Sequence, residues 1–95
     1  MKSEILIQSV SREIEIITKR IFAIKNAFNQ TNNINLRKRL SNEYSFLFKR
    51  FLDLKSKVFL FERENKNNLS YSLILYEKYS RCEKLIFQSN NLFFV

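Results

Sequence analysis

Glycine, proline and histidine are absent from this 95-residue sequence, and cysteine occurs once, as Cys82. A fold rich in strands and tight turns needs glycine for positive φ angles and proline for fixed ones. Their absence excludes a glycine-rich phosphate-binding loop and a two-residue glycine hairpin. A small number of long helices joined by short polar connections remains compatible with this composition.

The usual groups of enzyme catalysis are also missing. Without histidine the chain has no Ser-His or Cys-His pair to activate a nucleophile, and one cysteine cannot form an internal disulfide. A structural zinc site would have almost no ligands. The scattered acids, among them Glu13, Glu15 and Glu43, show no paired spacing for acid–base work. We therefore expect no enzyme activity, no catalytic or metal-binding residues, no cofactor and no small-molecule substrate.

The length fits one domain, and 45% hydrophobic and 27% charged residues are ordinary values for a folded globular chain. The first eight residues hold an apolar patch of three residues, much shorter than the apolar core of a secretory signal. No segment approaches the ~20 apolar residues of a membrane span. We expect a single helical domain over residues 1–95, located in the cytoplasm.

Apolar residues recur at the helical period in three segments, which are separated by asparagine-rich breaks at residues 29–35 and 65–68. The spacing predicts helices over about residues 3–28, 36–63 and 69–88. The first helix carries an unbroken three-four stripe, a pattern typical of coiled coils. The members of this stripe are Ile7, Val10, Ile14, Ile17, Ile21, Ile24 and Phe28.

The second segment has two apolar rows. A three-four stripe runs from Leu40 to Phe61, and a second row lies beside it, so that apolar residues cover about half of the helix circumference. Such a wide arc suits a helix with two neighbours, and we expect the third helix to cover the second row, which consists of Phe48, Leu52 and Phe59. The third segment also has two rows, one with Leu69, Leu73, Tyr76 and Phe87, the other with Leu75, Tyr79, Cys82 and Ile86.

Two long helices joined by a short connection usually pack antiparallel. The predicted fold is therefore all-α: a small three-helix bundle in which the first two helices form an antiparallel, coiled-coil-like hairpin. The alternative is a helical hairpin that dimerises, because a further apolar row on the first helix could receive either the third helix or a partner chain. That row consists of Ile5, Ile16, Ala23 and Ala27.

The net charge of +8, from 17 basic and 9 acidic residues, is unevenly spread, and residues 31–66 carry nine Lys or Arg against four Asp or Glu. Five of these cations share the face of the second helix opposite its apolar arc, where they could track the phosphates of a nucleic acid. A solvated polar face is the simpler interpretation, since any amphipathic helix shows one to water. The candidate residues for an anionic partner are Lys38, Arg39, Lys49, Arg50 and Lys57.

The last residues of the sequence are apolar, although the stretch 89–91 before them is polar. Chain ends are usually polar and frayed. The tail therefore predicts either a cap that folds onto the bundle or a docking element for another protein or a second copy. The candidate protein-docking residues are Leu92, Phe93, Phe94 and Val95.

Surplus apolar surface and missing catalytic groups together favour a non-enzymatic helical module for protein–protein interaction: an adaptor, an assembly factor or a small regulatory subunit. Its expected partner is another protein or, in an oligomer, a second copy. The alternative is a basic nucleic-acid-binding helical module that uses the outer face of the second helix, although no motif of known DNA- or RNA-binding folds supports it. A membrane surface is not an expected partner, because the second helix is too apolar to leave the bundle for lipid.

Overall fold

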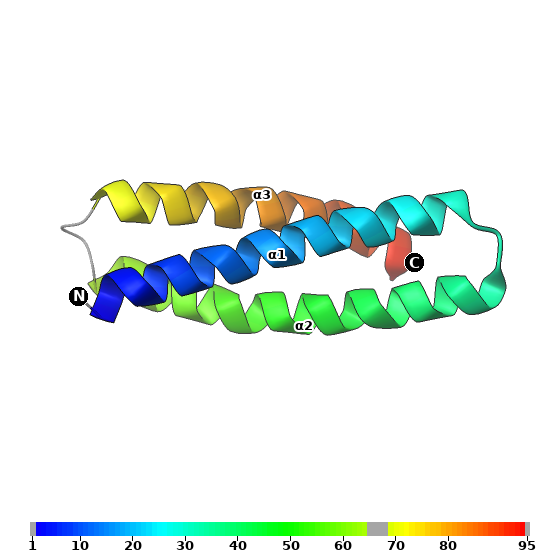
Figure 1. Ribbon diagram of the computed structural model, residues 1–95, viewed down its shortest axis with the longest axis horizontal. Helices are drawn as coiled ribbons and strands as arrows, with labels where there is room; N and C mark the ends of the chain where they lie inside the picture. Colours follow the sequence, from blue (N-terminus) through cyan, green and yellow to red (C-terminus); the bar gives the residue numbers. More distant parts are fainter. Residues whose placement is uncertain (1, 65–68, 95) are drawn as a thin grey trace.

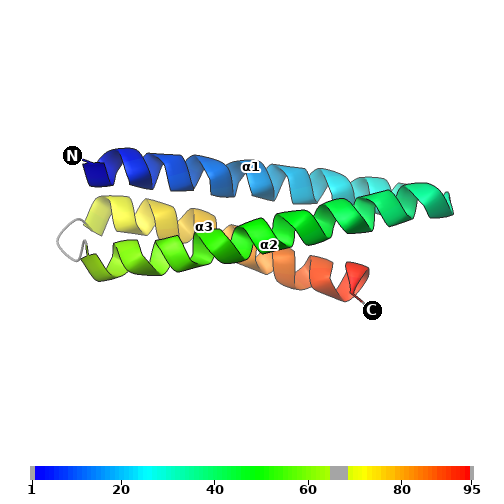
Figure 2. The ribbon, with the colours of Figure 1, turned by 90° about the horizontal axis from the view of Figure 1, so that it is seen from below.

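The computed structural model of the chain describes residues 2–64 and 69–94, with side chains for 8–60 and 73–94. It contains three long helices, α1 (Lys2–Gln30), α2 (Ile34–Glu64) and α3 (Leu69–Phe93). They lie side by side in a rod whose Cα extents are 50 × 19 × 17 Å (Figures 1 and 2). α1 and α3 run in one direction and α2 in the other (Figure 1). The predicted all-α three-helix bundle is confirmed.

The three-four stripe of α1 forms the centre of the core. Its residues from Val10 to Ile24 are almost fully buried, as the spacing predicts. Each such burial contributes about 2 kcal/mol relative to an exposed side chain. The stripe packs against Leu40, Tyr44, Phe51, Leu54 and Val58 of α2 and Leu75, Tyr79, Cys82 and Ile86 of α3. Other members of the predicted rows lie outside the described side chains, namely Ile5, Ile7, Phe61 and Leu69.

α3 does not cover the second apolar row of α2, so that expectation is wrong. Phe48 is half-buried, but Leu52 and Phe59 are exposed. On α3, Tyr76 and Phe87 are exposed as well. The reason is that α3 packs far more extensively on α1 than on α2. The side of the bundle between α2 and α3 therefore stays open.

The additional apolar row of α1 is not filled by α3 either. Ile16 and Ala23 are exposed, and Ala27 is half-buried. α1 meets α3 with a different flank, on which Glu15 Oε2 lies 3.6 Å from the Nζ atom of Lys78. Ala27 packs at the edge of the core, whereas isolated exposed apolar side chains such as Ile16 are ordinary on a protein surface.

The α1–α2 connection is fixed by its own side chains. Asn33 caps α2, because its Oδ1 atom accepts hydrogen bonds from the backbone N–H groups of Asn35 (3.0 Å) and Leu36 (3.3 Å). The Oγ1 atom of Thr31 accepts one from the N–H of Asn33 at 3.2 Å. α2 consequently begins at Ile34, whereas the sequence predicts a start near residue 36.

α3 continues to Phe93, although the sequence predicts an end near residue 88. Two of the polar residues before the apolar tail, Ser89 and Asn90, have partners inside the bundle. Ser89 Oγ donates to the carbonyl oxygen of Leu85 at 2.7 Å, and the side chain of Asn90 accepts from the hydroxyl of Tyr44. Because these polar groups are satisfied, they can be buried without interrupting the helix.

Candidate interaction surfaces

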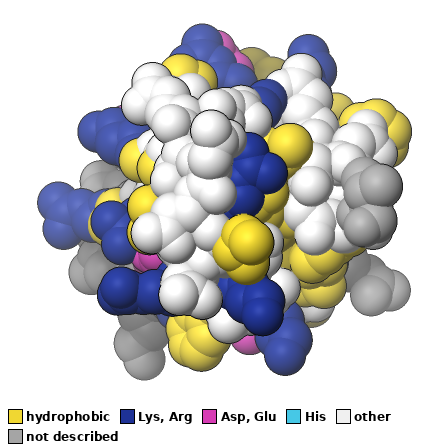
Figure 3. Space-filling view, turned by 90° about the vertical axis from the view of Figure 1, so that its right-hand side faces the viewer, with side chains coloured by type: hydrophobic (Ala, Val, Ile, Leu, Met, Phe, Trp, Pro, Cys, Tyr) yellow, Lys and Arg dark blue, Asp and Glu magenta, His cyan; other side chains and the backbone are white. Residues whose placement is uncertain are grey.

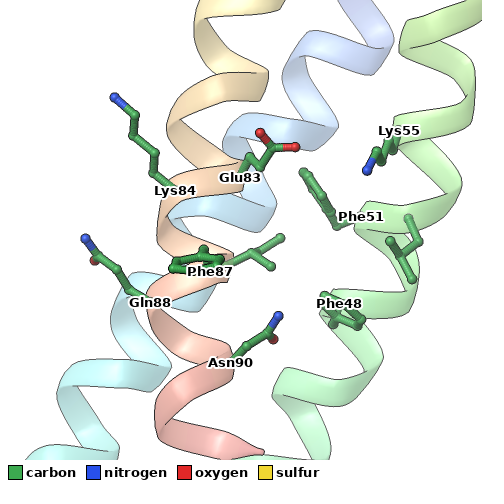
Figure 4. Close-up of a pocket in the computed structure, with 10 residues that line it drawn as sticks. Phe48, Phe51, Lys55, Glu83, Lys84, Phe87, Gln88 and Asn90 are labelled. Carbon is green, nitrogen blue, oxygen red and sulfur yellow. The ribbon is translucent and has the colours of Figure 1, made fainter.

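An apolar groove lies between α2 and α3, and α1 passes behind it (Figure 4). Its volume is about 510 Å³. The groove exists because each of the two helices carries a second apolar row that the other helix leaves largely uncovered. The apolar residues that line it are Phe48, Phe51, Leu52, Ile86 and Phe87.

The lining grades from a buried floor to exposed rims. Phe51 on the floor stacks on Tyr79, with ring centroids 5.4 Å apart and an interplanar angle of 13°. On the rims, Leu52 of α2 is 43% exposed and Phe87 of α3 is 72% exposed. Covering these rims would remove apolar area from water at about 25 cal/mol per Å². Exposed apolar surface of this kind marks an interaction site more often than a scattered side chain does.

The charged residues of the groove are mainly basic. Lys55 of α2 and Glu83 of α3 reach toward it, whereas Lys84 points away from it into solvent (Figure 4). The hydroxyl of Tyr79 donates to Glu83 Oε2 at 2.8 Å, which engages the one carboxylate among the described lining residues. The border of the groove therefore presents Lys55 and a partly satisfied Glu83, and Lys84 adds positive charge outside it.

The tail packs onto an aromatic cluster next to the groove. Phe93 stacks on Tyr44 with ring centroids 4.6 Å apart and meets Phe28 of α1 edge-on at 4.8 Å. Phe94 lies 5.4 Å from Tyr44 and 5.8 Å from Phe48. Because Phe48 also lines the groove, the tail closes one end of that apolar surface.

The four predicted docking residues differ in their environments. Leu92 and Phe93 are half-buried, whereas Phe94 is exposed. Val95 lies outside the described residues. The structure thus brings the tail against the bundle itself, and its docking to another molecule stays a prediction.

Two buried groups have shifted pKa values. Burial raises the pKa of Tyr44 to about 12, and the nearby Cys82 adds to the effect. Burial also raises the pKa of the Cys82 thiol; the hydrogen bond with Thr18 opposes this and the charge of Glu83 reinforces it. A thiol with a raised pKa is a weak nucleophile at neutral pH. The buried Cys82 therefore acts as a packing group in this bundle.

Residues 2–64 and 69–94 contain neither a metal-ligating cluster nor a membrane-spanning helix. No group of three or more His, Cys, Asp or Glu side chains there is arranged to hold a metal ion. None of the helices has an apolar stretch long enough to cross a bilayer.

The five cations predicted to form one face of α2 are all exposed, but they follow two lines. One line runs through Lys38 and Lys49. The other, about 100° around the helix, runs through Arg39, Arg50 and Lys57. The structure therefore does not bring the five together as a single row.

Carboxylates neutralise the middle of this face. The guanidinium of Arg50 contacts Glu13 Oε1 of α1 at 2.7 Å. Asp53 lies between the two lines of cations and is exposed. On α1, Arg20 pairs with Glu43 of α2. Positive charge at mid-bundle is thus partly balanced.

The α1–α2 connection extends beyond the end of α3 (Figure 1), and residues 16–42 around it hold six Lys or Arg and no Asp or Glu. Lys and Arg side chains surround this end of the molecule in Figure 3. The Arg20–Glu43 and Glu13–Arg50 pairs fix the register of α1 and α2, and this register places Lys25 level with Lys38. We name this surface the basic tip; it consists of Lys25, Arg37, Lys38 and Arg39.

The charge pattern of a single helix does not predict the basic tip, because the tip combines residues from two helices. The sequence nevertheless carries a signal for it. No Asp or Glu occurs between Glu15 and Glu43, and this stretch spans the connection. An acid-free run across a helix–helix turn predicts a positive end of a bundle, because antiparallel packing brings both flanks of the turn together.

Comparison of the chain with known protein families, with curated proteins and with solved structures finds no match. The function is therefore argued from the groove and the basic tip.

Proposed function

We propose that the chain is a non-enzymatic interaction module, an adaptor, assembly factor or small regulatory subunit, whose α2–α3 groove binds an amphipathic helix of a partner protein. The observation that carries the proposal is the groove itself, in which the exposed Leu52 and Phe87 border the buried Phe51. Docking of a helix into an apolar groove is a common mode of recognition. The partner helix would occupy the place of a fourth helix.

The spacing of the exposed apolar residues suits a helix as occupant. On α2 the row extends from Phe48 to Phe59, and on α3 Tyr76 and Phe87 share one line. The ends of each row are eleven residues apart, which corresponds to about 16 Å or three turns of helix. A partner helix of about three to four turns would therefore bury both rows along their length.

Charge favours an acidic partner over a second copy of the chain. The protein carries a net charge of +8, and the charged residues that line the groove are Lys55, Lys84 and Glu83, of which Lys55 and Glu83 reach toward it. Two copies would bring like-charged surfaces together, which opposes association. A helix with Asp or Glu beside its apolar stripe would complement the border instead. The partner class that we propose is an acidic amphipathic helix of another protein.

Site-specific photo-crosslinking in cells that naturally produce the chain tests this proposal. A photoreactive phenylalanine analogue replaces Phe87 in the groove or, as the matched control, Phe46. Phe46 is 76% exposed and lies on the far side of α2 from the groove. Because both side chains are largely exposed, neither replacement disturbs the core.

The expected result is a discrete adduct from position 87 and none from position 46. The crosslinked peptide of the partner should lie in an amphipathic segment with flanking Asp or Glu. Equal adducts from both positions, or no adduct from position 87, would contradict the proposal. A crosslink to a second copy of the chain would contradict the acidic partner and show that the groove binds another copy of the protein.

A further inference from the structure

The shape of the basic tip is held by hydrogen bonds within the connection. The Nε atom of Arg37 donates to the carbonyl oxygen of Thr31 at 2.8 Å, and its guanidinium lies 4.7 Å from the centroid of the Phe28 ring. The cap that Asn33 provides fixes the first turn of α2. A surface that is already ordered loses less conformational entropy when it binds.

The charge of the tip has no carboxylate to balance it. In the part of the chain that the structure describes, the four ion pairs join other residues and none includes a member of the basic tip. Lys25 Nζ has a neutral partner, the Oε1 atom of Gln88 at 3.4 Å. Like charges that lack carboxylate partners repel one another, so gathering the four cations at one end of the bundle does not by itself stabilise the fold. A polyanion would remove the repulsion.

We propose that the basic tip binds the phosphate backbone of a nucleic acid. The surroundings of the cations favour this partner over a membrane. Amide and hydroxyl side chains donate to phosphate and sugar oxygens. Around the α1–α2 connection, next to the tip, five such amides are exposed against two large apolar residues, Ile34 and Leu36. The amides are Asn29, Gln30, Asn32, Asn33 and Asn35.

A hollow beside the tip offers further polar side chains to a ligand that is bound there. Its volume is about 340 Å³, and Arg37, Lys38, Ser41 and Asn42 line it together with Phe28 and Ile34. Guanidinium planes stack on nucleobases, and the guanidinium of Arg37 is already held over Phe28 at this site. The hollow therefore places a stacking surface next to phosphate-binding cations.

This surface is separate from the groove. The groove lies along the open side between α2 and α3, whereas the tip lies on α1 and α2 near the connection that joins them. Both can be occupied at once, so the chain would connect a nucleic acid with the proposed protein partner. The nucleic-acid proposal does not rest on the groove.

Fluorescence anisotropy with a labelled 20-nucleotide oligouridylate and a labelled 20-base-pair DNA duplex tests the proposal. Four phosphate contacts give a slope of about −2.8 for the logarithm of single-strand affinity against the logarithm of salt concentration, which corresponds to about 50-fold weaker binding at 200 mM than at 50 mM salt. The tip variant carries Lys38→Glu and Arg39→Glu. The control carries Lys49→Glu and Lys57→Glu and changes the net charge equally.

We expect the tip variant to bind the preferred probe more than ten-fold more weakly at 50 mM salt and with about half the salt slope. The control should stay within three-fold of the unsubstituted protein. The tip variant should remain folded, since acidic residues near the start of α2 interact favourably with the helix dipole. A thermal melt by circular dichroism verifies the folding of both variants.

Three results would overturn the proposal. One is the absence of binding to both probes at 50 mM salt. Another is an equal loss in both variants, which would show that net charge alone is responsible. The third is tip-dependent binding to phosphatidylserine vesicles in the absence of binding to either nucleic acid. A Phe87→Glu variant should bind the probe unchanged, so that failure of the groove proposal is distinguished from failure of this one.

Discussion

At the scale of single residues, Tyr44 has the largest number of roles in the bundle. Its ring is fully buried and stacks on Phe93 of α3. Its hydroxyl lies within hydrogen-bonding distance of the Ile86 carbonyl oxygen, at 3.1 Å, and of Asn90 Oδ1. A buried hydroxyl is costly unless it is paired. These contacts therefore attach the last turns of α3 to α2.

Substitution Tyr44→Phe is expected to lower the free energy of unfolding by about 1–2 kcal/mol, because the acceptors on α3 lose their buried donor. Urea unfolding followed by circular dichroism measures the change. The matched control is Tyr76→Phe, which removes a hydroxyl from an exposed ring and should change the stability by less than about 0.5 kcal/mol. Equal effects of the two substitutions would contradict the role of Tyr44.

The pH dependence of stability gives a second readout of the same residue. The folded protein holds the pKa of Tyr44 at about 12, above the ordinary value of 10.0, so folding favours the neutral phenol. This contribution to stability is fully present below pH 10 and is lost as the pH rises to about 12. The advantage of the unsubstituted protein over Tyr44→Phe should therefore shrink across this range. A constant difference would show that Tyr44 does not titrate as a buried group.

At the scale of elements, α3 determines where the open surface lies. It packs its row of Leu75, Tyr79, Cys82 and Ile86 chiefly against α1 and leaves its other apolar row beside the second row of α2. Both rows were visible in the sequence. Which neighbour each would meet depends on how the helices are placed around one another, and the spacing within one helix carries no information about that.

Substitutions in the last residues of the tail distinguish a capping role from a docking role. Phe93→Ala is expected to lower the free energy of unfolding by about 2 kcal/mol, since it removes the ring between Tyr44 and Phe28. Phe94→Ala should cost less than about 1 kcal/mol, because that ring is half exposed. Chemical denaturation of both variants measures the two values.

A larger loss from Phe94→Ala than from Phe93→Ala would contradict this packing. If Phe94→Ala keeps the stability and weakens capture of the protein that crosslinks to position 87, the tail also contributes to docking. Unchanged capture would leave Phe94 as a cap alone.

At the scale of the whole molecule, the sequence predicts more of the core than of the surfaces. The spacing from Val10 to Ile24 identifies the central stripe correctly, because a buried face repeats with the period of the helix. Ser89 and Asn90 mislead, since polar residues suggest a break until their buried partners are known. The basic tip requires the register between α1 and α2, which no single segment contains.

The whole molecule also explains why the cations of α2 divide into two groups. Lys38 and Arg39 lie near the α1–α2 connection, where the neighbouring stretch of α1 has no acids. Arg50 lies at mid-bundle, where Glu13 of α1 faces it. Cations on the same helix therefore lie in different electrostatic potentials, because the neighbouring stretches of α1 differ in charge.

The central claim is that the α2–α3 groove binds an acidic amphipathic helix. Its most direct test is a titration of the ¹⁵N-labelled chain with a synthetic 18-residue helical peptide that carries leucines on one face and glutamates beside them, followed by amide chemical shifts. We expect shift changes at residues 48–55 and 83–90, with Phe46 unaffected. Changes confined to the basic tip, or none at millimolar peptide, would contradict the claim.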